Sequence, residues 1–179
     1  EIITTPVTFV STNHAILYEN LKPVFADVDQ YLCLDPADVE KKITGKTRAV
    51  IFVGYGGRVG QLDKVLEICK QHGLHLILDA AHMSGTRVNG VTPGTWEGVD
   101  VAVYSYQAVK NLPTGDSGMI CFADGELDAE CRKVSWMGIN KDTYARTSSE
   151  GTYKWNYGVD YVGYKYNGNA IMAGIALAQ

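Results

Sequence analysis

Two residues that follow hydrophobic runs, one directly and one in the turn after the run, are the ones most suited to chemistry in this sequence. Lys110 comes after the run at residues 99–103 and lies in a turn bounded by Pro113 and Gly115. A lone lysine in such a turn is usually a solvated surface residue. A lysine amine held in a crowded, partly apolar loop is instead suited to forming a Schiff base with a carbonyl compound. Lys110 by itself leaves both interpretations open.

Asp79 ends the hydrophobic run at residues 74–78 and is followed by Ala80, Ala81 and His82. An aspartate in this position is often only the N-cap of a helix. The alternative is a buried carboxylate that keeps the nitrogen of a pyridine ring protonated, with small alanines beside the ring and His82 near a ring substituent. A protonated pyridine accepts electrons from a carbanion, as reactions on amino acids require. Asp79 and a turn lysine one strand later are therefore the pair expected at a pyridoxal phosphate site.

The elements that must position this pair alternate between strands and helices. The strand-like segments are residues 2–5, 23–26, 49–53, 74–78, 99–103 and 119–123, and the helix-like segments are residues 11–18, 36–43, 62–71, 127–136 and 171–179. This alternation predicts an α/β fold with a mostly parallel sheet flanked by helices. Ligands bind at the carboxyl ends of the strands in such sheets. Asp79 and Lys110 are both expected at such ends.

Two of the expected helices carry clear boundary signals. Asp35 is suited to cap the helix at residues 36–43, with Pro36 at its first position. Gly73 is expected to end the helix at residues 62–71. One face of that helix is apolar and should pack on the sheet, through Leu62, Val65, Leu66 and Cys69.

Composition limits the classes of function. With 179 residues, of which 46% are hydrophobic and 20% charged, the chain can form one globular domain over residues 1–179. Its net charge of -4 argues against a nucleic-acid partner or an acidic membrane surface, and no hydrophobic run reaches the length of a membrane span. The four cysteines lie far apart, so neither a metal site nor a disulfide framework is expected. These features favour a cytoplasmic protein with small-molecule partners.

Two other stretches suggest alternative functions. Residues 54–60 imitate a dinucleotide-binding fingerprint, but the third glycine falls one place late and several residues precede the next helix. That alternative is disfavoured. Residues 141–169 are polar, rich in aromatic residues and too long for an ordinary connection, which suggests a functional or partner-contacting loop. RNA binding by these tyrosines is disfavoured because few basic residues accompany them.

Six motifs, in this order along the chain, resemble the DegT/DnrJ/EryC1 family of sugar aminotransferases. They are TPVTFVST at residues 5–12, PVFADVD at 23–29, DAAH at 79–82, SYQAVKNLPTG at 105–115, GINKD at 138–142 and GYKYN at 163–167. The resemblance covers nearly the whole chain. It implies the large domain of a fold type I pyridoxal 5'-phosphate enzyme. It also implies a homodimer that moves an amino group, usually from glutamate, to a nucleotide-linked keto sugar.

The resemblance also implies roles for the residues that match the family motifs. Lys110 would form the Schiff base with the cofactor and then move a proton between substrate and cofactor. Asp79 would pair with the pyridine nitrogen, and His82 would contact the ring hydroxyl. Phe9 would stack on the face of the ring, although without the resemblance it is more often a core residue.

Two further implied roles concern the cofactor phosphate and the partner subunit. Ser105, five residues before the lysine, would hold the phosphate. Asn167 would reach into the active site of the neighbouring subunit. Without the resemblance, Ser105 is more often a strand-end hydroxyl, and the tyrosine-rich residues 155–166 merely form an aromatic loop.

The chain also departs from the family pattern. Gly54 stands where relatives often have a histidine, and Ser117 lies in a turn that usually has glycine there. Because the family's N-terminal phosphate-binding segment and C-terminal small domain are absent, residues 1–179 are expected to be the cofactor-binding core of a longer protein, inactive alone. A related sugar dehydratase, with histidine in place of Lys110, and a non-catalytic fragment that binds no cofactor are the alternatives.

Overall fold

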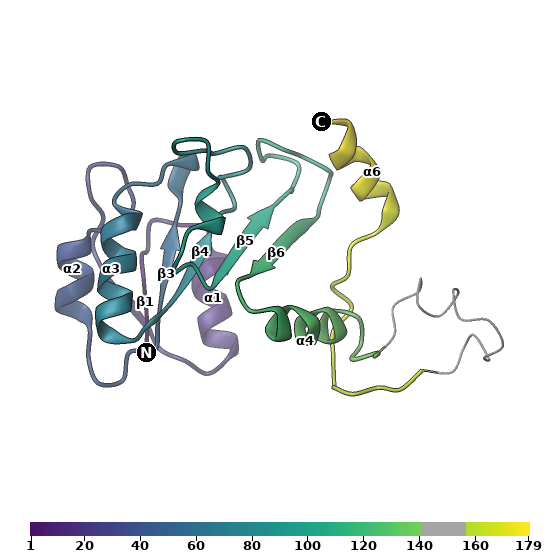
Figure 1. Cartoon of the computed structure of the whole chain (residues 1–179), viewed down its shortest axis with the longest axis horizontal. Coiled ribbons are helices and arrows are strands. Elements are labelled where there is room, and N and C mark those ends of the chain that lie inside the picture. Colours follow the sequence, from purple (N-terminus) through teal and green to yellow (C-terminus); the bar gives the residue numbers. More distant parts are fainter. Residues whose placement is uncertain (141–156) are drawn as a thin grey trace.

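A six-stranded sheet forms the centre of the protein, in the order β2-β1-β3-β4-β5-β6 (Figure 1). The computed structural model describes residues 1–140 and 157–179. Strands β1 to β5 are parallel, and β6 pairs antiparallel with β5 at the edge. The predicted α/β fold with a mostly parallel sheet is thus confirmed. The strands are β1 (Ile2–Thr4), β2 (Pro23–Phe25), β3 (Ala49–Val53), β4 (His75–Asp79), β5 (Val101–Ser105) and β6 (Gly118–Phe122).

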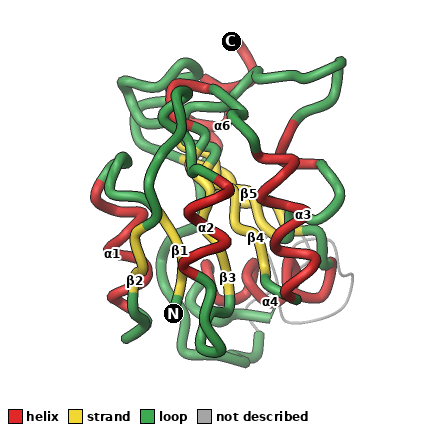
Figure 2. Tube along the Cα trace, turned by 90° about the vertical axis from the view of Figure 1, so that its left-hand side faces the viewer, coloured by secondary structure: helices red, strands yellow, loops and turns green. Residues whose placement is uncertain are grey.

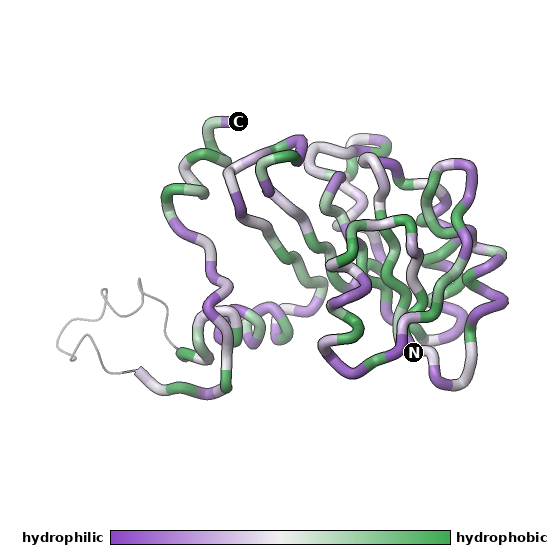
Figure 3. Tube along the Cα trace, turned by 180° about the vertical axis from the view of Figure 1, so that it is seen from behind, coloured by the Kyte–Doolittle hydropathy of each residue, from purple (hydrophilic) through white to green (hydrophobic). Residues whose placement is uncertain are grey.

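Helices cover both faces of the sheet (Figure 2). Alternate strand residues point to opposite faces, so Val50 packs with Val39 and Val65 of two helices on one face. On the other face, Ile51 packs with Ile16 of a third helix. Figure 3 shows hydrophobic residues along the strands between these layers. The helices are α1 (Val10–Tyr18), α2 (Pro36–Lys42), α3 (Leu62–His72), α4 (Gly125–Ser135) and α6 (Ala170–Ala178), with short 3-10 turns η1 (Tyr55–Gly57) and η2 (Pro93–Thr95).

The predicted boundary signals of α2 and α3 are confirmed. The Asp35 carboxylate accepts a hydrogen bond from the backbone N–H of Ala37 at 3.0 Å and so caps α2. Gly73 ends α3 in a left-handed conformation with φ of 62°, which glycine adopts without steric strain. Gly73 ends the helix directly before β4, and β4 pairs along its whole length with β3, which places Asp79 beside Val53 at the end of the pair.

The chain after β6 forms an arm beside the sheet (Figure 1). Residues 157–167 run along the end of α4, where the N–H of Tyr164 donates to the carbonyl of Val134 at 2.7 Å. The rings of Tyr164 and Tyr166 stack 4.8 Å apart. Helix α6 follows, with Ile171 and Leu177 exposed. The rest of the predicted partner-contacting loop, residues 141–156, lies outside the described residues.

The described part of the chain contains neither a membrane-spanning helix nor a metal cluster. None of the helices in the described part of the chain is long and apolar enough to cross a membrane. Within residues 1–140 and 157–179, no group of three or more His, Cys, Asp or Glu side chains could hold a metal ion. The four cysteines are free thiols, and Cys33 and Cys69 are buried.

Candidate active site at the carboxyl ends of the parallel strands

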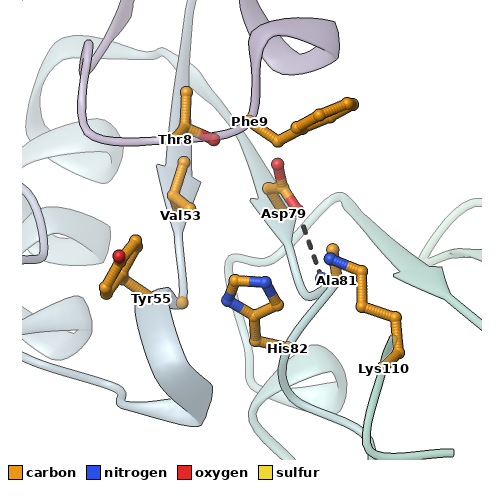
Figure 4. Close-up of a pocket in the computed structure, with 9 residues that line it drawn as sticks. Thr8, Phe9, Val53, Tyr55, Asp79, Ala81, His82 and Lys110 are labelled. Atoms are coloured by element: carbon orange, nitrogen blue, oxygen red, sulfur yellow. Dashed lines mark hydrogen bonds between the residues drawn. The ribbon is translucent and has the colours of Figure 1, made fainter. Parts of the chain in front are cut away.

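A pocket opens where β3, β4 and β5 end, and four segments far apart in the sequence contribute to it (Figure 4). The turn before α1 forms one wall, and the residues after β3 form another. The loop after β4 and the loop after β5 complete it. The lining residues are Thr8, Phe9, Val53, Gly54, Tyr55, Asp79, Ala81, His82 and Lys110.

Asp79 is held at both carboxylate oxygens. Its Oδ1 accepts a hydrogen bond from the N–H of Ala81 at 3.1 Å, drawn as a dashed line in Figure 4. Its Oδ2 accepts a hydrogen bond from the hydroxyl of Thr12 at 2.7 Å. Among the described residues, which include this whole loop, no helix begins at residues 80–85. Asp79 is therefore not a helix cap, and its carboxylate faces the pocket.

Lys110 lies in a loop that is tied to its surroundings at several points. Its own N–H donates to the carbonyl of Gln107 at 2.9 Å and closes a turn. The side chain of Asn111 donates to the carbonyl of Ser84, in the loop that follows Asp79. In Figure 4 the amino group of Lys110 points into the pocket between Asp79 and His82. The lysine is therefore a pocket residue rather than a solvated surface residue.

His82 has a defined orientation. Its Nδ1 accepts a hydrogen bond from the N–H of Gly56 at 3.2 Å, so the proton of the neutral ring is on Nε2. The ring of Tyr55 packs edge-on at 5.9 Å between centroids. Burial lowers the pKa of His82, and the charge of Lys110 lowers it further, while Asp79 acts in the opposite direction.

Phe9 immediately precedes α1 and projects over the pocket (Figure 4). The residue is 73% exposed, so it is not a core residue. An exposed aromatic ring at the mouth of a pocket offers a flat apolar face to a bound ring. Phe9 thus lines the pocket, and its stacking role stays a prediction.

The structure does not bring the other two predicted residues to the pocket. Ser105 ends β5 near the site, and its Oγ accepts a hydrogen bond from the N–H of Gln107 at 3.4 Å. Asn167 lies beside the end of α4, where its N–H donates to the carbonyl of Ser135 at 3.1 Å. Its side-chain oxygen accepts a hydrogen bond from Lys165 at 2.8 Å. The phosphate role of Ser105 and the cross-subunit role of Asn167 stay predictions.

The structure also reveals site residues for which no role was predicted. Thr8 and Tyr55 line the pocket, and Thr12 contacts Asp79. Thr8 precedes α1 and Thr12 lies in its first turn, so helical spacing does not relate the two and neither carried a signal in the sequence. Tyr55 carries no such signal.

The two departures from the family pattern have structural explanations. A side chain at Gly54 would collide with the buried side chain of Met83, so a histidine there would require Met83 to move. The φ angle of Ser117 is not positive, so a serine can adopt this backbone conformation without strain. Its hydroxyl forms a hydrogen bond with that of Thr114.

The donor set of the pocket fits pyridoxal phosphate. The cofactor needs an amine for its aldehyde, a carboxylate for its ring nitrogen and an aromatic face for its ring. Lys110, Asp79 and Phe9 supply these groups around one pocket, and the Nε2–H of His82 adds a donor for the ring hydroxyl.

Comparisons with known proteins identify relatives that match nearly all of this chain. The spore coat polysaccharide biosynthesis protein SpsC of Bacillus subtilis is 38% identical over 100% of this chain and 45% of its own length. The dTDP-4-dehydro-2,3,6-trideoxy-D-glucose 4-aminotransferase of Saccharopolyspora spinosa is 32% identical over 100% of this chain and 46% of its own. The crystal structure of the aminotransferase TlmJ from Streptoalloteichus hindustanus matches with a TM-score of 0.86 and 32% identity, over 99% of this chain and 45% of TlmJ.

The chain spans a little under half the length of these relatives. The structural likeness confirms the fold of the large domain of fold type I pyridoxal phosphate enzymes. A family model of the DegT/DnrJ/EryC1/StrS aminotransferases matches residues 1–179, and the chain belongs to this family.

Proposed function

We propose that this chain forms the cofactor-binding core of a pyridoxal-phosphate-dependent aminotransferase that moves an amino group from glutamate to a nucleotide-linked keto sugar. The observation that carries the proposal is that Lys110, Asp79, His82 and Phe9 line one pocket. A lysine that points into this pocket supports an aminotransferase over the related dehydratase, in which a histidine replaces it. It also supports a catalytic role over a fragment that binds no cofactor.

Each residue of the pocket has a defined task in this reaction. When bound, pyridoxal phosphate supplies an electron-poor ring that stabilises negative charge on the carbon bearing the amino group. Asp79 accepts a hydrogen bond from the ring nitrogen and so keeps it protonated. Lys110 holds the cofactor through its amino group and, once released, carries a proton to and from the reacting carbon. His82 donates from Nε2 to the ring hydroxyl, and Phe9 covers one face of the ring.

The proposed substrate rests on the relatives and on the family resemblance. The name of the S. spinosa relative gives it a dTDP-linked keto sugar as substrate, and SpsC is named for polysaccharide biosynthesis. A nucleotide-linked keto sugar is therefore the proposed acceptor, and polysaccharide biosynthesis the proposed process. Glutamate as the amino donor follows from the family resemblance.

Three finer points are part of the same proposal. Ser105 binds the cofactor phosphate, and this role is supported by its place at the end of β5, five residues before the lysine. The active protein is a homodimer in which Asn167 enters the partner's site. The proposed compartment is the cytoplasm, supported by the four free thiols.

The proposal is tested by loading the full-length protein with pyridoxal phosphate and recording its absorbance spectrum. Borohydride reduction followed by peptide mass spectrometry should locate the cofactor on Lys110. Lys110→Ala should abolish the adduct, whereas Lys70→Ala, on the exposed surface of α3, should leave it unchanged. Transamination is then measured as formation of 2-oxoglutarate from glutamate with nucleotide-linked keto sugars.

Two outcomes would contradict the assignment. An adduct on another lysine in the unsubstituted protein would remove the proposed role of Lys110. Absence of any bound cofactor at saturating concentration would favour the non-catalytic alternative.

A further inference from the structure

Two threonine hydroxyls connect the start of α1 to the carboxylate of Asp79. Thr12, in the first turn of α1, donates a hydrogen bond to Oδ2 of Asp79 at 2.7 Å. The hydroxyl oxygens of Thr8 and Thr12 are 2.9 Å apart. Thr8 in turn lines the pocket. The hydroxyl of Thr12 therefore links Thr8, in the pocket wall, to the carboxylate of Asp79.

The direction of this chain of hydrogen bonds follows from proton counting. A threonine hydroxyl has one proton, and an ionised carboxylate can only accept. The proton of Thr12 is used in the bond to Asp79. Thr8 must therefore donate to Thr12, which leaves only lone pairs of Thr8 to face the pocket. The order of donation is Thr8 to Thr12 to Asp79.

These contacts restrict the carboxylate of Asp79. The N–H of Ala81 holds Oδ1 from the loop after β4, and Thr12 holds Oδ2 from α1. Since the two donors come from different elements, rotation of the carboxylate would break at least one hydrogen bond. Each carboxylate oxygen accepts about two hydrogen bonds, so a further donor in the pocket can still be bound.

We propose that Thr12 is a positioning residue for Asp79, which orients the carboxylate toward the nitrogen of a bound pyridine ring. This inference rests on the proposed function, because only a pyridine-type cofactor gives the orientation of Asp79 a chemical purpose. A purely structural role would instead make Thr12 a link between α1 and β4, with no particular effect on the cofactor.

The test uses the full-length protein and two substitutions at Thr12. Thr12→Val keeps the shape of the side chain and removes the hydroxyl, and Thr12→Ser keeps the hydroxyl. A hydrogen bond to a charged group is worth enough for its loss to weaken pyridoxal phosphate binding about tenfold or more. We expect Thr12→Val to show this loss in a fluorescence titration with pyridoxal phosphate, and Thr12→Ser to stay within about twofold of the unsubstituted protein.

A matched control is available at the opposite end of the sheet. The hydroxyl of Thr44 donates to a carboxylate oxygen of Glu1 at 2.6 Å, the same type of contact away from the pocket. Thr44→Val should therefore leave cofactor binding unchanged. Thermal unfolding without cofactor is measured for every variant, so that loss of the fold is separated from loss of orientation.

A double-mutant cycle with Asp79→Asn distinguishes positioning from a structural link. If Thr12 acts through the carboxylate, Thr12→Val should change cofactor affinity by less than about twofold in the Asp79→Asn background. An equal loss in both backgrounds, or failure of Thr12→Ser to restore binding, overturns the proposal. If the unsubstituted protein binds no pyridoxal phosphate, the proposed function fails first. If it binds normally and Thr12→Val has no effect, the proposed function stands and only this inference fails.

Discussion

The Nδ1 atom of His82 accepts a hydrogen bond from the backbone N–H of Gly56 at 3.2 Å, and this contact joins the loops that follow β4 and β3. It fixes the proton of the neutral ring on Nε2. Burial and the neighbouring Lys110 both lower the pKa of His82 below its ordinary value of about 6.5. The ring is therefore a neutral donor toward the pocket at physiological pH.

Removal of the lysine charge should raise the pKa of His82. In the protein without cofactor, Lys110→Ala eliminates the second of the two influences that lower this pKa, while burial remains. We expect an upward shift in an NMR titration of the imidazole, with the signal assigned by its loss in His82→Gln. Lys70→Ala serves as the control and should not move it. An unchanged titration in Lys110→Ala would show that the two side chains do not interact.

The same pKa shift makes the stability of the fold depend on pH. Because the pKa of His82 is lower in the folded than in the unfolded protein, its contribution to stability is fully present above about pH 6.5. That contribution is lost as the pH falls through the folded-state pKa. We expect the free energy of unfolding to fall less steeply between about pH 6.5 and 5 in His82→Gln than in the unsubstituted protein. Equal slopes in urea titrations would contradict this expectation.

Asp79→Asn should separate cofactor attachment from catalysis. A neutral amide cannot keep the ring nitrogen protonated, so the rate of transamination should fall by several orders of magnitude. The bond between Lys110 and the cofactor should remain reducible by borohydride. Single-turnover rates with glutamate measure the effect. A loss below about tenfold, or ~1.4 kcal/mol of transition-state stabilisation, would assign Asp79 a structural role only.

Gly54→Ala should destabilise the protein, because the new methyl group would collide with the side chain of Met83, which is 1% exposed. Overpacking of this kind costs about 1–3 kcal/mol. Gly45→Ala is the matched control, since no atom lies within 4 Å of the added group. Urea unfolding measures both variants. If the two substitutions have equal effects, Met83 is not what excludes a side chain at position 54.

Subunit complementation tests the cross-subunit role of Asn167. If the site is shared, mixing an inactive Asn167→Ala protein with an inactive Lys110→Ala protein should form hybrid dimers. One site of each hybrid then carries both defects and the other carries neither, so activity reappears. Native mass spectrometry checks that subunits exchange. Exchange without recovered activity would mean that Asn167 serves its own subunit.

The placement of the two central site residues was predictable from local sequence. Buried parallel strands read as continuous hydrophobic runs, so the residue that ends each run is located at the site edge. Asp79 directly ends one such run and Lys110 lies in the turn after the next, and the structure places both at the same pocket. The bounds of β4 and α3 were also predicted to within one residue at each end.

Other features depend on tertiary contacts that no local pattern encodes. The hydrogen bond from Thr12 to Asp79 joins residues 67 positions apart. The exclusion of a side chain at Gly54 depends on Met83, in a different loop. The predicted role of Asn167 depends on contacts with a second subunit, which no local pattern encodes. Physical contact between distant segments, rather than propensity, decides these features.

The antiparallel edge strand has a consequence for folding. Among the described strands, only β5 and β6 are antiparallel neighbours, and their pairing joins Ser105 to Gly118 across the loop that carries Lys110. Contacts between residues close in sequence lose less chain entropy than crossover connections, so they form faster. We expect pulsed hydrogen exchange to show protection of β5 and β6 amides before those of β1 and β3. The lysine loop would then be closed while the strands on the far side of Asp79 are still assembling.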